Sequence, residues 1–450
     1  MTRSLQPSIL VSENDKLVMW NYNGTFYKEV LNGFCKVSDP HSNGFVDMDG
    51  DCMADLFLTC MKDDKLGIEV YITPEFELKY QTNLPENAGQ ILFGDFDADG
   101  TIDILFPICN TECFINVLYN IQLPICQDDS LNCRQLTDLC TPSPFSFDPK
   151  SGGNYVTSPL NNIIPDYRLL SIKLGDYNND GFPDLLVVVS SKYDKYRKYI
   201  RLLESVECDF TCGTRAMQKR RRTFKLVTTG VDQLYSIDSV IHGAMMDMNN
   251  DGSLDVFVSY KPDGQTKTSV FINNIYKDAL FFKPLVLNSL CLTCDTTKPY
   301  GVNYAGASFK HTVIDTNGKV RVTQSCQLPQ QAYMSLQVAN NVIGLGRTNN
   351  YIDNLFVGVS RNENVHYRSY QGLIPNSGIV IGPYEENHEG PEEWKLELYM
   401  NPSSTTNAII IVLSSVCIIL GAIIFGLDLS ERRQDYIEKR EQLENIDFEY

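Results

Sequence analysis

The sequence predicts an all-β protein: a β-propeller, then a β-sandwich-like module, and finally one C-terminal transmembrane helix. Three observations support this prediction. An acidic loop followed by a short apolar strand occurs four times before residue 260. Strand-like runs follow one another in this region without helical patterns between them, which is typical of antiparallel meanders. Near the C-terminus, 20 consecutive residues carry no charge, and this is the length that an α-helix needs to cross a bilayer.

The acidic loops define a repeat. They begin at Asp47, Asp95, Asp176 and Asp247 and read DMDGDCMAD, DFDADGTID, DYNNDGFPD and DMNNDGSLD. An apolar strand, a turn-rich interval and a second β-rich run follow each loop, so that one repeat holds about three or four strands, the size of a propeller blade. The first residues, SILVS, KLVMWNYN and TFYKEV, look like the later strands of a blade that has no acidic loop. The sequence therefore predicts an N-terminally incomplete propeller.

The spacing within the loops indicates cation binding. Carboxylate or amide oxygens at positions 1, 3, 5 and 9, with a backbone carbonyl at position 7, converge on one centre and suit a hard cation, for which Ca²⁺ is the first choice. A glycine at position 6 permits the left-handed turn that wraps three of the loops. We therefore predict up to four structural calcium sites. Their ligands are Asp47, Asp49, Asp51, Met53 (carbonyl) and Asp55; Asp95, Asp97, Asp99, Thr101 (carbonyl) and Asp103; Asp176, Asn178, Asp180, Phe182 (carbonyl) and Asp184; and Asp247, Asn249, Asp251, Ser253 (carbonyl) and Asp255.

The same loop sequences are also compatible with structures that bind no calcium. Asx-type turns without an ion are one alternative, and a catalytic carboxylate pair is another. Four copies in register, each leading into a strand, favour ion binding over both. An EF-hand is excluded because the loops have no Glu at position 12 and no flanking helices. The loop at Asp47 departs most from the pattern, since Cys52 stands at position 6 and Gly50 at position 4.

The part of the chain after the repeats is predicted to be a separate β-rich module. The runs SFKHTVID and KVRVTQSC flank a TNG turn, which is a hairpin signal, and YIDNLFVGVS and GIVIGP continue the strands. The predicted parts are the propeller over 1–298, the membrane-proximal β-rich module over 299–400, a linker over 401–407, the transmembrane helix over 408–427 and a cytoplasmic tail over 428–450.

Charges beside the apolar stretch predict its orientation. Arg432 and Arg433 follow it closely, whereas Lys395 alone lies near its other flank. The positive-inside rule then places the tail in the cytosol and residues 1–407 outside the cell or in a lumen. This describes a type I single-pass protein of the plasma membrane or the secretory pathway. The first residues contain no apolar run long enough for a signal peptide, so we expect either a signal absent from this form or insertion directed by the C-terminal span.

Cysteine usage agrees with an oxidising compartment. All but one of the 14 cysteines precede the apolar stretch, several of them in clusters, which predicts disulfides. A zinc site is the alternative for Cys291 and Cys294 in CLTC, but no second pair stands in register with them. Cys52 and Cys60 flank a predicted buried strand, so they are interpreted as free core thiols. Asn23 in NGT is the one usable glycosylation sequon.

Charge and histidine placement argue against several functions. The net charge of −18 argues against a nucleic-acid partner, which needs a basic face. The five histidines are scattered outside any recognisable nucleophile or metal motif, so we expect a protein that is not an enzyme. The basic run Gln218–Lys225, QKRRRTFK, is predicted to be an exposed hairpin, with a protease-cleavable loop or a patch for an anionic partner as alternatives.

The runs FGDFDADGTID and LGDYNNDGFPD resemble the FG-GAP repeat of integrin alpha-chain propellers. The later runs GLGRTNNYIDN and GLIPNSGIVIGP, followed by the apolar span, are similar to the T-cell immunomodulatory protein (linkin) family. This resemblance implies a type I glycoprotein at the cell surface, whose FG-GAP propeller acts in cell adhesion or in modulation of T-cell responses through an extracellular or cell-surface protein ligand. Two other functions stay open: a secretory-pathway assembly or trafficking factor, and a scaffold for a glycan-processing enzyme.

Overall fold

A computed structural model of the chain describes most of its residues. They are 9–22, 25–62, 65–126, 132–147, 155–164, 167–194, 196–275, 278–288, 302–338, 342–348, 351–360, 366–383, 394–400 and 404–444. The predicted glycosylation site Asn23 and the CLTC cysteines lie outside these residues. The chain forms two compact units, Met1–Tyr399 and Met400–Tyr450.

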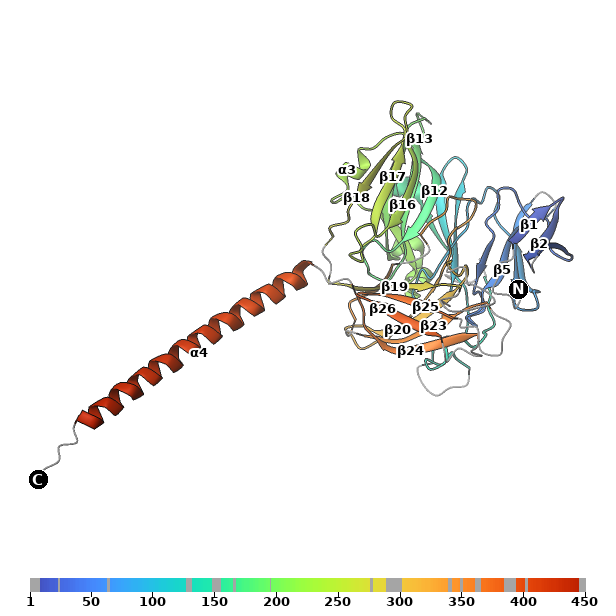
Figure 1. The fold of residues 1–450 in the computed structure, drawn as a ribbon. Coiled ribbons are helices and arrows are strands. Elements are labelled where there is room, and N and C mark those ends of the chain that lie inside the picture. The colour runs from blue at the N-terminus through green and yellow to red at the C-terminus, as the bar shows by residue number, and fades with distance from the viewer. Residues whose placement is uncertain are drawn as a thin grey trace, which may run out of the picture. The chain divides into compact units, whose positions relative to one another are not determined.

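Five sheets follow one another through the first part of the larger unit, and each is an antiparallel meander in which consecutive strands pair (Figure 1). Their strands are β1 (Ile9–Glu13), β2 (Lys16–Tyr22) and β3 (Phe26–Leu31); β4 (Gly44–Val46), β5 (Asp55–Lys62), β6 (Lys65–Ile72) and β7 (Glu77–Asn83); β8 (Leu92–Gly94), β9 (Asp103–Cys109), β10 (Cys113–Leu118) and β11 (Tyr155–Pro159); β12 (Tyr167–Gly175), β13 (Asp184–Ser191), β14 (Lys198–Glu207) and β15 (Arg222–Leu226); and β16 (Val240–Met246), β17 (Asp255–Tyr260) and β18 (Lys267–Phe271).

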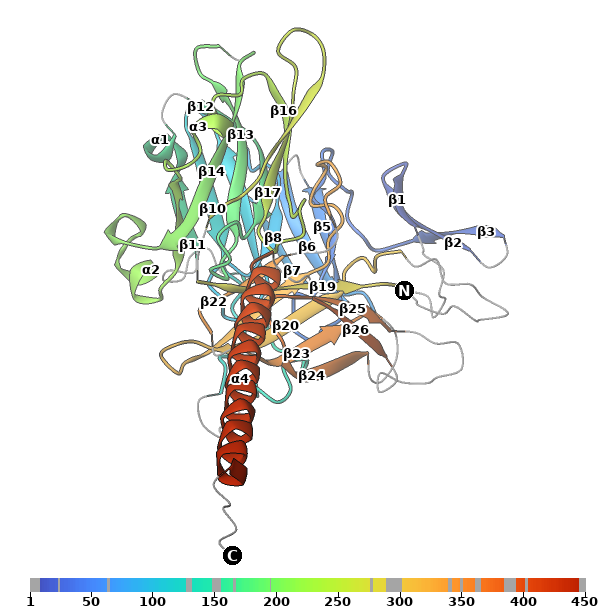
Figure 2. The same cartoon turned by 60° about the vertical axis from the view of Figure 1, so that its left-hand side comes forward.

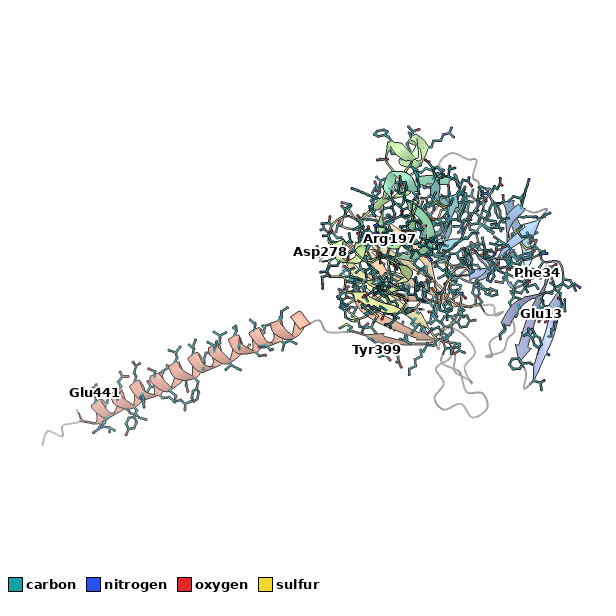
Figure 3. The ribbon with its side chains drawn as sticks, turned by 90° about the horizontal axis from the view of Figure 1, so that it is seen from above. Glu13, Phe34, Arg197, Asp278, Tyr399 and Glu441 are labelled. Carbon is teal, nitrogen blue, oxygen red and sulfur yellow. A yellow bond between two sulfur atoms is a disulfide. The ribbon has the colours of Figure 1, made fainter. Side chains whose placement is uncertain are left out.

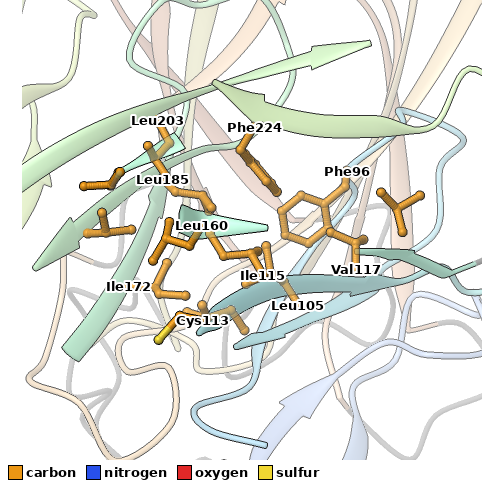
Figure 4. Close-up of a cluster of buried hydrophobic side chains, with 14 of the residues drawn as sticks. Phe96, Leu105, Cys113, Ile115, Val117, Leu160, Ile172, Leu185, Leu203 and Phe224 are labelled. Atoms are coloured by element: carbon orange, nitrogen blue, oxygen red, sulfur yellow. The ribbon is translucent and has the colours of Figure 1, made fainter. Parts of the chain in front are cut away.

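Neighbouring sheets share hydrophobic clusters, because alternate side chains of a strand point to opposite faces. On β9, Ile104 and Phe106 pack with side chains of the second sheet, whereas Leu105 packs with side chains of the fourth. Figure 4 shows the cluster between the third and fourth sheets, where Ile115 and Leu185 meet. The all-β prediction is confirmed for this region, and the N-terminally incomplete FG-GAP propeller stays a prediction.

The N-terminal sheet is held by polar contacts on one side. Glu13 on β1 forms an ion pair with Lys28 on β3 and accepts a hydrogen bond from Trp20 Nε1 at 3.1 Å (Figure 3). On the other side, Leu17 packs with Leu56 and other side chains of the second sheet.

Two four-stranded sheets enclosing one core form the rest of this unit, and we call them the sandwich (Figure 2). One sheet has the order β22-β19-β25-β26 and the other β21-β20-β23-β24. Their strands are β19 (Leu280–Val286), β20 (Ser308–Ile314), β21 (Val320–Cys326), β22 (Ile343–Gly346), β23 (Ile352–Gly358), β24 (Tyr367–Leu373), β25 (Ser377–Gly382) and β26 (Lys395–Tyr399).

The strand β19 corrects one sequence prediction. LFFKPLV falls within residues 1–298, which were assigned to the propeller, but it pairs antiparallel with β22 and parallel with β25. Phe282 and Val286 are fully buried in the core of the sandwich. An alternating apolar strand joins the sheet that buries its apolar face, and for β19 that sheet belongs to the sandwich. The fifth sheet consequently has three strands among the described residues.

The smaller unit contains one long helix, α4 (Ser404–Glu444). It includes the uncharged stretch, whose side chains are exposed, and by length and composition it could cross a membrane. The prediction of a single apolar C-terminal helix is confirmed. The larger unit adds short helical turns, α1 (Leu160–Ile163), η1 (Phe210–Cys212), α2 (Thr214–Gln218) and α3 (Asp232–Tyr235).

The predicted disulfides are confirmed, and two cysteine assignments are wrong. Cys52 and Cys60 were interpreted as free thiols, but Cys52 is bonded to Cys140 and Cys60 to Cys35. Their Cα atoms lie 5.0 and 5.7 Å from those of their partners, within the range that a disulfide bridges. The described structure also holds three local bridges, Cys109–Cys113, Cys126–Cys133 and Cys208–Cys212.

Candidate metal centres at the acidic loops

Each acidic loop connects the first two strands of one sheet, so the fold places the four loops at equivalent points. We number them loop 1 (Asp47–Asp55, between β4 and β5), loop 2 (Asp95–Asp103, between β8 and β9), loop 3 (Asp176–Asp184, between β12 and β13) and loop 4 (Asp247–Asp255, between β16 and β17). Positions 1 and 9 of each loop therefore flank a hairpin turn.

The backbone of the four loops follows one path. Positions 4 and 6 are left-handed in all of them. These residues are Gly50 (φ 87°) and Cys52 (70°), Ala98 (55°) and Gly100 (78°), Asn179 (57°) and Gly181 (86°), and Asn250 (62°) and Gly252 (89°). Loop 1 thus reaches the common conformation with a cysteine at position 6, although a side chain is strained in this region.

The aspartate at position 1 accepts the backbone N–H of position 6 in every loop. The N–H of Gly100 donates to Asp95 Oδ2 at 2.9 Å, and the N–H of Gly181 donates to Asp176 Oδ2 at 2.7 Å. In loop 1 the donor to Asp47 Oδ2 is Cys52 N at 3.0 Å. The carboxylate at position 1 therefore holds the turn through hydrogen bonds within the loop.

The aspartate at position 9 ties each loop to the end of the third strand of its sheet. Asp55 Oδ2 accepts the N–H of Met48 at 2.9 Å, and its Oδ1 accepts the N–H of Thr73 at 3.1 Å. The same two bonds recur at Asp103, Asp184 and Asp255. Each of these carboxylates thus has a structural role, with lone pairs left for an ion.

Carboxylate oxygens converge most clearly in loops 1 and 2. One oxygen from each of Asp47, Asp49 and Asp55 lies within 4.8 Å of the others, and the same holds for Asp95, Asp97 and Asp99. In loops 3 and 4 an amide stands at position 3: Asn178 Nδ2 donates to Glu204 and Asn249 Nδ2 to Asp251, at 3.1 and 2.7 Å. All four donor sets consist of oxygen ligands, which is the chemistry that Ca²⁺ requires.

Burial and crowding make these carboxylates electrostatically costly. Burial, and next the neighbouring charge of Asp99, raises the pKa of Asp95 to about 8. Burial and the charge of Asp180 raise the pKa of Asp176 to about 7. In loop 1, burial and the charge of Asp47 raise the pKa of Asp51 to about 8. A bound dication would offset this repulsion.

One buried oxygen in loop 2 lacks a protein partner. Within the described residues, Asp97 Oδ1 is buried without a hydrogen bond, while Asp97 Oδ2 forms an ion pair with Arg221. Arg134 donates to the carbonyls of Asp99 and Gly100 at 2.8 and 2.9 Å. The residues of loop 2 fit a cation, because an unpartnered buried carboxylate oxygen lies beside two further carboxylates.

The contact of Arg221 with Asp97 corrects another prediction. The run Gln218–Lys225 was expected to be an exposed hairpin, but Arg221 and Arg222 are buried. Arg222 Nη2 donates to the Ser205 carbonyl at 2.8 Å, and its guanidinium lies 3.7 Å from the ring centre of Phe182. Both guanidinium groups make charge-assisted contacts inside the fold, which is why this part of the basic run does not face solvent.

Basic side chains distant in sequence also contact the other loops. Lys310 Nζ lies 3.8 Å from Asp47 Oδ2 and donates to the carbonyls of Gly50 and Leu139. In loop 4, Lys283 Nζ lies 2.7 Å from Asp247 Oδ2. In loop 3, Arg321 Nη1 donates to the Asp180 carbonyl at 3.0 Å.

Sequence reasoning missed these basic contacts because no local signal marks them. Lys310 is separated from Gly50 by 260 residues, and its surroundings, SFKHTVID, read as an ordinary strand. Lys310 shares its face of β20 with Ser308 and Thr312, opposite the apolar Phe309 and Val313, so the alternation alone predicts a solvent-exposed lysine.

Comparison with known proteins agrees with this architecture. Residues 299–399 match the family model described as ITFG1, C2 domain. The chain is 32% identical over 469 residues to T-cell immunomodulatory protein of Homo sapiens, an alignment covering 99% of this chain and 71% of the human protein.

The chain belongs to the T-cell immunomodulatory protein family. Within the family, it is 31% identical over 449 residues to the T-cell immunomodulatory protein homolog of Plasmodium falciparum, covering 90% of this chain and 61% of that protein. It is 24% identical over 437 residues to protein linkin of Caenorhabditis elegans, covering 91% of this chain and 66% of linkin. The chain thus spans about two thirds of the length of these family members.

Proposed function

We propose that this chain is a non-enzymatic, single-pass type I membrane glycoprotein with a calcium-binding FG-GAP propeller. It acts in cell adhesion or in modulation of T-cell and other immune responses, through an extracellular or cell-surface protein ligand. The apolar helix α4 and the disulfides support a membrane-anchored protein with its larger unit in an oxidising compartment. The names of its relatives, T-cell immunomodulatory proteins, support the immune role.

The observation that carries the calcium proposal is the buried cluster of loop 2. Asp95, Asp97 and Asp99 bring three carboxylates together, and Asp97 Oδ1 has no hydrogen-bond partner among the described residues. Buried carboxylates are retained when they are paired or when they coordinate a metal. Calcium suits them better than magnesium, which gives up its bound waters reluctantly.

Isothermal titration calorimetry with calcium, on the full chain in detergent micelles, tests this function. We expect saturable calcium binding to wild type and the loss of one site when Asp97 and Asp99 are both changed to Ala. Asp263→Ala is the control, because Asp263 lies outside the four loops and its side chain is 84% exposed. Absence of binding to wild type, or unchanged stoichiometry in the double variant, would contradict the proposal.

Epitope tags test the orientation. A tag before residue 9 should be accessible to antibody on intact cells, while a tag after Tyr450 should become accessible only after permeabilisation. The opposite pattern would rule out the type I topology.

A further inference from the structure

The sandwich covers the acidic loops with its own polar groups. Ser308 Oγ donates to Asp47 Oδ2 at 2.9 Å, and Gln324 Nε2 donates to the same oxygen at 2.8 Å. The backbone N–H of Gln324 donates to Asp95 Oδ2 at 2.9 Å. One residue of β21 therefore bridges the first aspartates of loops 1 and 2.

The sandwich contacts loops 3 and 4 as well. Gly346 N donates to the Asn179 carbonyl at 2.9 Å, beside the bond from Arg321 to loop 3. Lys283 on β19 forms the ion pair with Asp247 in loop 4. All four loops consequently touch the same module, although they lie in four different sheets.

Glycines allow the backbone of the sandwich to approach the loops closely. A Cβ on Gly358 would lie 2.0 Å from the carbonyl oxygen of Cys52 in loop 1. A Cβ on Gly344 would lie 2.1 Å from Asp176 Oδ2 in loop 3. Real Cβ atoms do not occur at such distances, so the two surfaces fit only with glycine at these positions.

The charges at this contact are unbalanced within the protein. Loop 1 holds four aspartates, of which Asp47 and Asp55 are fully buried, and Lys310 brings one positive charge to them. Covering such a cluster removes water from several carboxylates, which costs free energy unless further positive charge accompanies them. A loop that has bound a dication can be covered at lower cost than an empty one.

We propose that cation binding by the loops and docking of the sandwich are coupled, so that calcium-loaded loops form the surface on which β20 and β21 dock. This inference rests on the calcium proposal. Calcium strengthens the docking, and docking raises calcium affinity by the same factor, because linkage between two binding equilibria is reciprocal. Removal of calcium loosens the sandwich and exposes the loop face of the sheets.

Hydrogen exchange of the full chain in detergent micelles tests the coupling. We expect exchange of the amides in 308–326 to rise at least about tenfold when EGTA replaces calcium. Amides of residues 186–189 in β13, whose side chains pack between the third and fifth sheets in clusters that contain no sandwich residue, should change little.

Two pairs of variants test the reverse direction of the linkage. Gly358→Ala places a Cβ against a carbonyl that is not a predicted ligand, and Gln324→Ala removes the amide bond to Asp47 without a steric clash. Each should lower calcium affinity by about tenfold. The matched controls Gly378→Ala and Gln371→Ala lie in the same sandwich away from the loops: a Cβ on Gly378 meets nothing closer than 3.7 Å, and Gln371 is exposed.

The outcomes separate this inference from the calcium proposal. If calorimetry detects no calcium binding to wild type, the proposed function fails, and the coupling fails with it. If calcium binds but the exchange of 308–326 is unchanged by EGTA, the coupling alone is overturned. Unchanged calcium affinity in both Gly358→Ala and Gln324→Ala also overturns it, and a tenfold loss in both, absent from the controls, supports it.

Discussion

Loops 1 and 4 have the same backbone and very different surroundings. Both place left-handed residues at positions 4 and 6, and in both the aspartate at position 9 accepts the same two N–H groups. Residues 47–50 of loop 1 are buried, whereas residues 248–251 of loop 4 are exposed. The geometry of a loop is therefore set locally, by its own hydrogen bonds, while its electrostatics are set by how far the sandwich covers it.

The largest expected loss of stability follows from replacing Lys310, which contacts loop 1, and it is compared with the loss from replacing Lys283, which contacts loop 4. Lys310→Met leaves Asp47 buried without its ammonium partner and should lower the free energy of unfolding by about 3–5 kcal/mol. Lys283→Met, on β19 beside loop 4, should cost less, about 2 kcal/mol, because Asp247 is nearly buried but residues 248–251 of its loop are exposed. Denaturant unfolding of the full chain in micelles measures both. Equal losses would show that coverage does not decide the electrostatics.

Changes at position 9 should lower the stability by the same amount in loops 1 and 4. Asp55→Asn and Asp255→Asn each replace one carboxylate oxygen by an amide N–H₂ group that faces a backbone donor, so one backbone N–H in each loop loses its acceptor. A loss of about 2 kcal/mol is expected for each. Unfolding of the two variants under one condition measures it. A clear difference between them would contradict the claim that position 9 has a local role.

A pH dependence should appear on the strand that covers loop 1. His311 on β20 is fully buried, and burial, then the charge of Arg321, lowers its pKa to about 3. The unfolded chain takes up the proton near pH 6.5 while the folded chain does not, so below that pH the native state loses about 1.4 kcal/mol per pH unit through this group.

The variant His311→Leu isolates this contribution. The unfolding free energy of wild type minus that of the variant should fall steadily from pH 6.5 to 4.5, because only the unfolded wild-type chain takes up a proton at this position. Unfolding curves at several pH values measure the difference. A constant difference over this range would show that His311 is protonated in the folded chain.

The smallest effect concerns backbone strain in loop 2. Ala98 at position 4 has a φ of 55°, where loop 1 has glycine. Ala98→Gly should stabilise the chain by about 0.5 kcal/mol, because relief of left-handed strain exceeds the added entropy of the unfolded chain. Thermal unfolding measures it, with Ala88→Gly, outside the loop, as a control expected to destabilise. Destabilisation of both variants would show that Ala98 carries no strain.

The local parts of this fold could be predicted from the sequence. Aspartates spaced at positions 1 and 9 around a left-handed turn specify the hairpin, because their hydrogen-bond partners lie within the loop and the sheet that follows. The β-rich repeats and the apolar helix were predicted for the same reason: period-two alternation and a long uncharged run are short-range patterns.

The parts that sequence reasoning missed are contacts between distant residues. β19 lies in the part of the chain assigned to the propeller, and only the sandwich core around Phe282 shows why it pairs elsewhere. Cys52 and Cys140 lie 88 residues apart, and nothing in either segment identifies the other. The ion pair of Arg221 with Asp97 likewise joins a run that looked solvent-exposed to a loop of the preceding sheet.

The position of Gln324 in the chain has a consequence for biosynthesis. Loops 1 and 2 leave the ribosome long before the residue that bridges them, which follows Asp47 by 277 residues. Because domains form from the N-terminus as synthesis proceeds, the first sheets exist for a time with their aspartates in water. Under the proposed calcium binding, an ion enters the loops during that interval without any opening of the finished protein, and the compartment in which the chain folds decides which cation becomes enclosed.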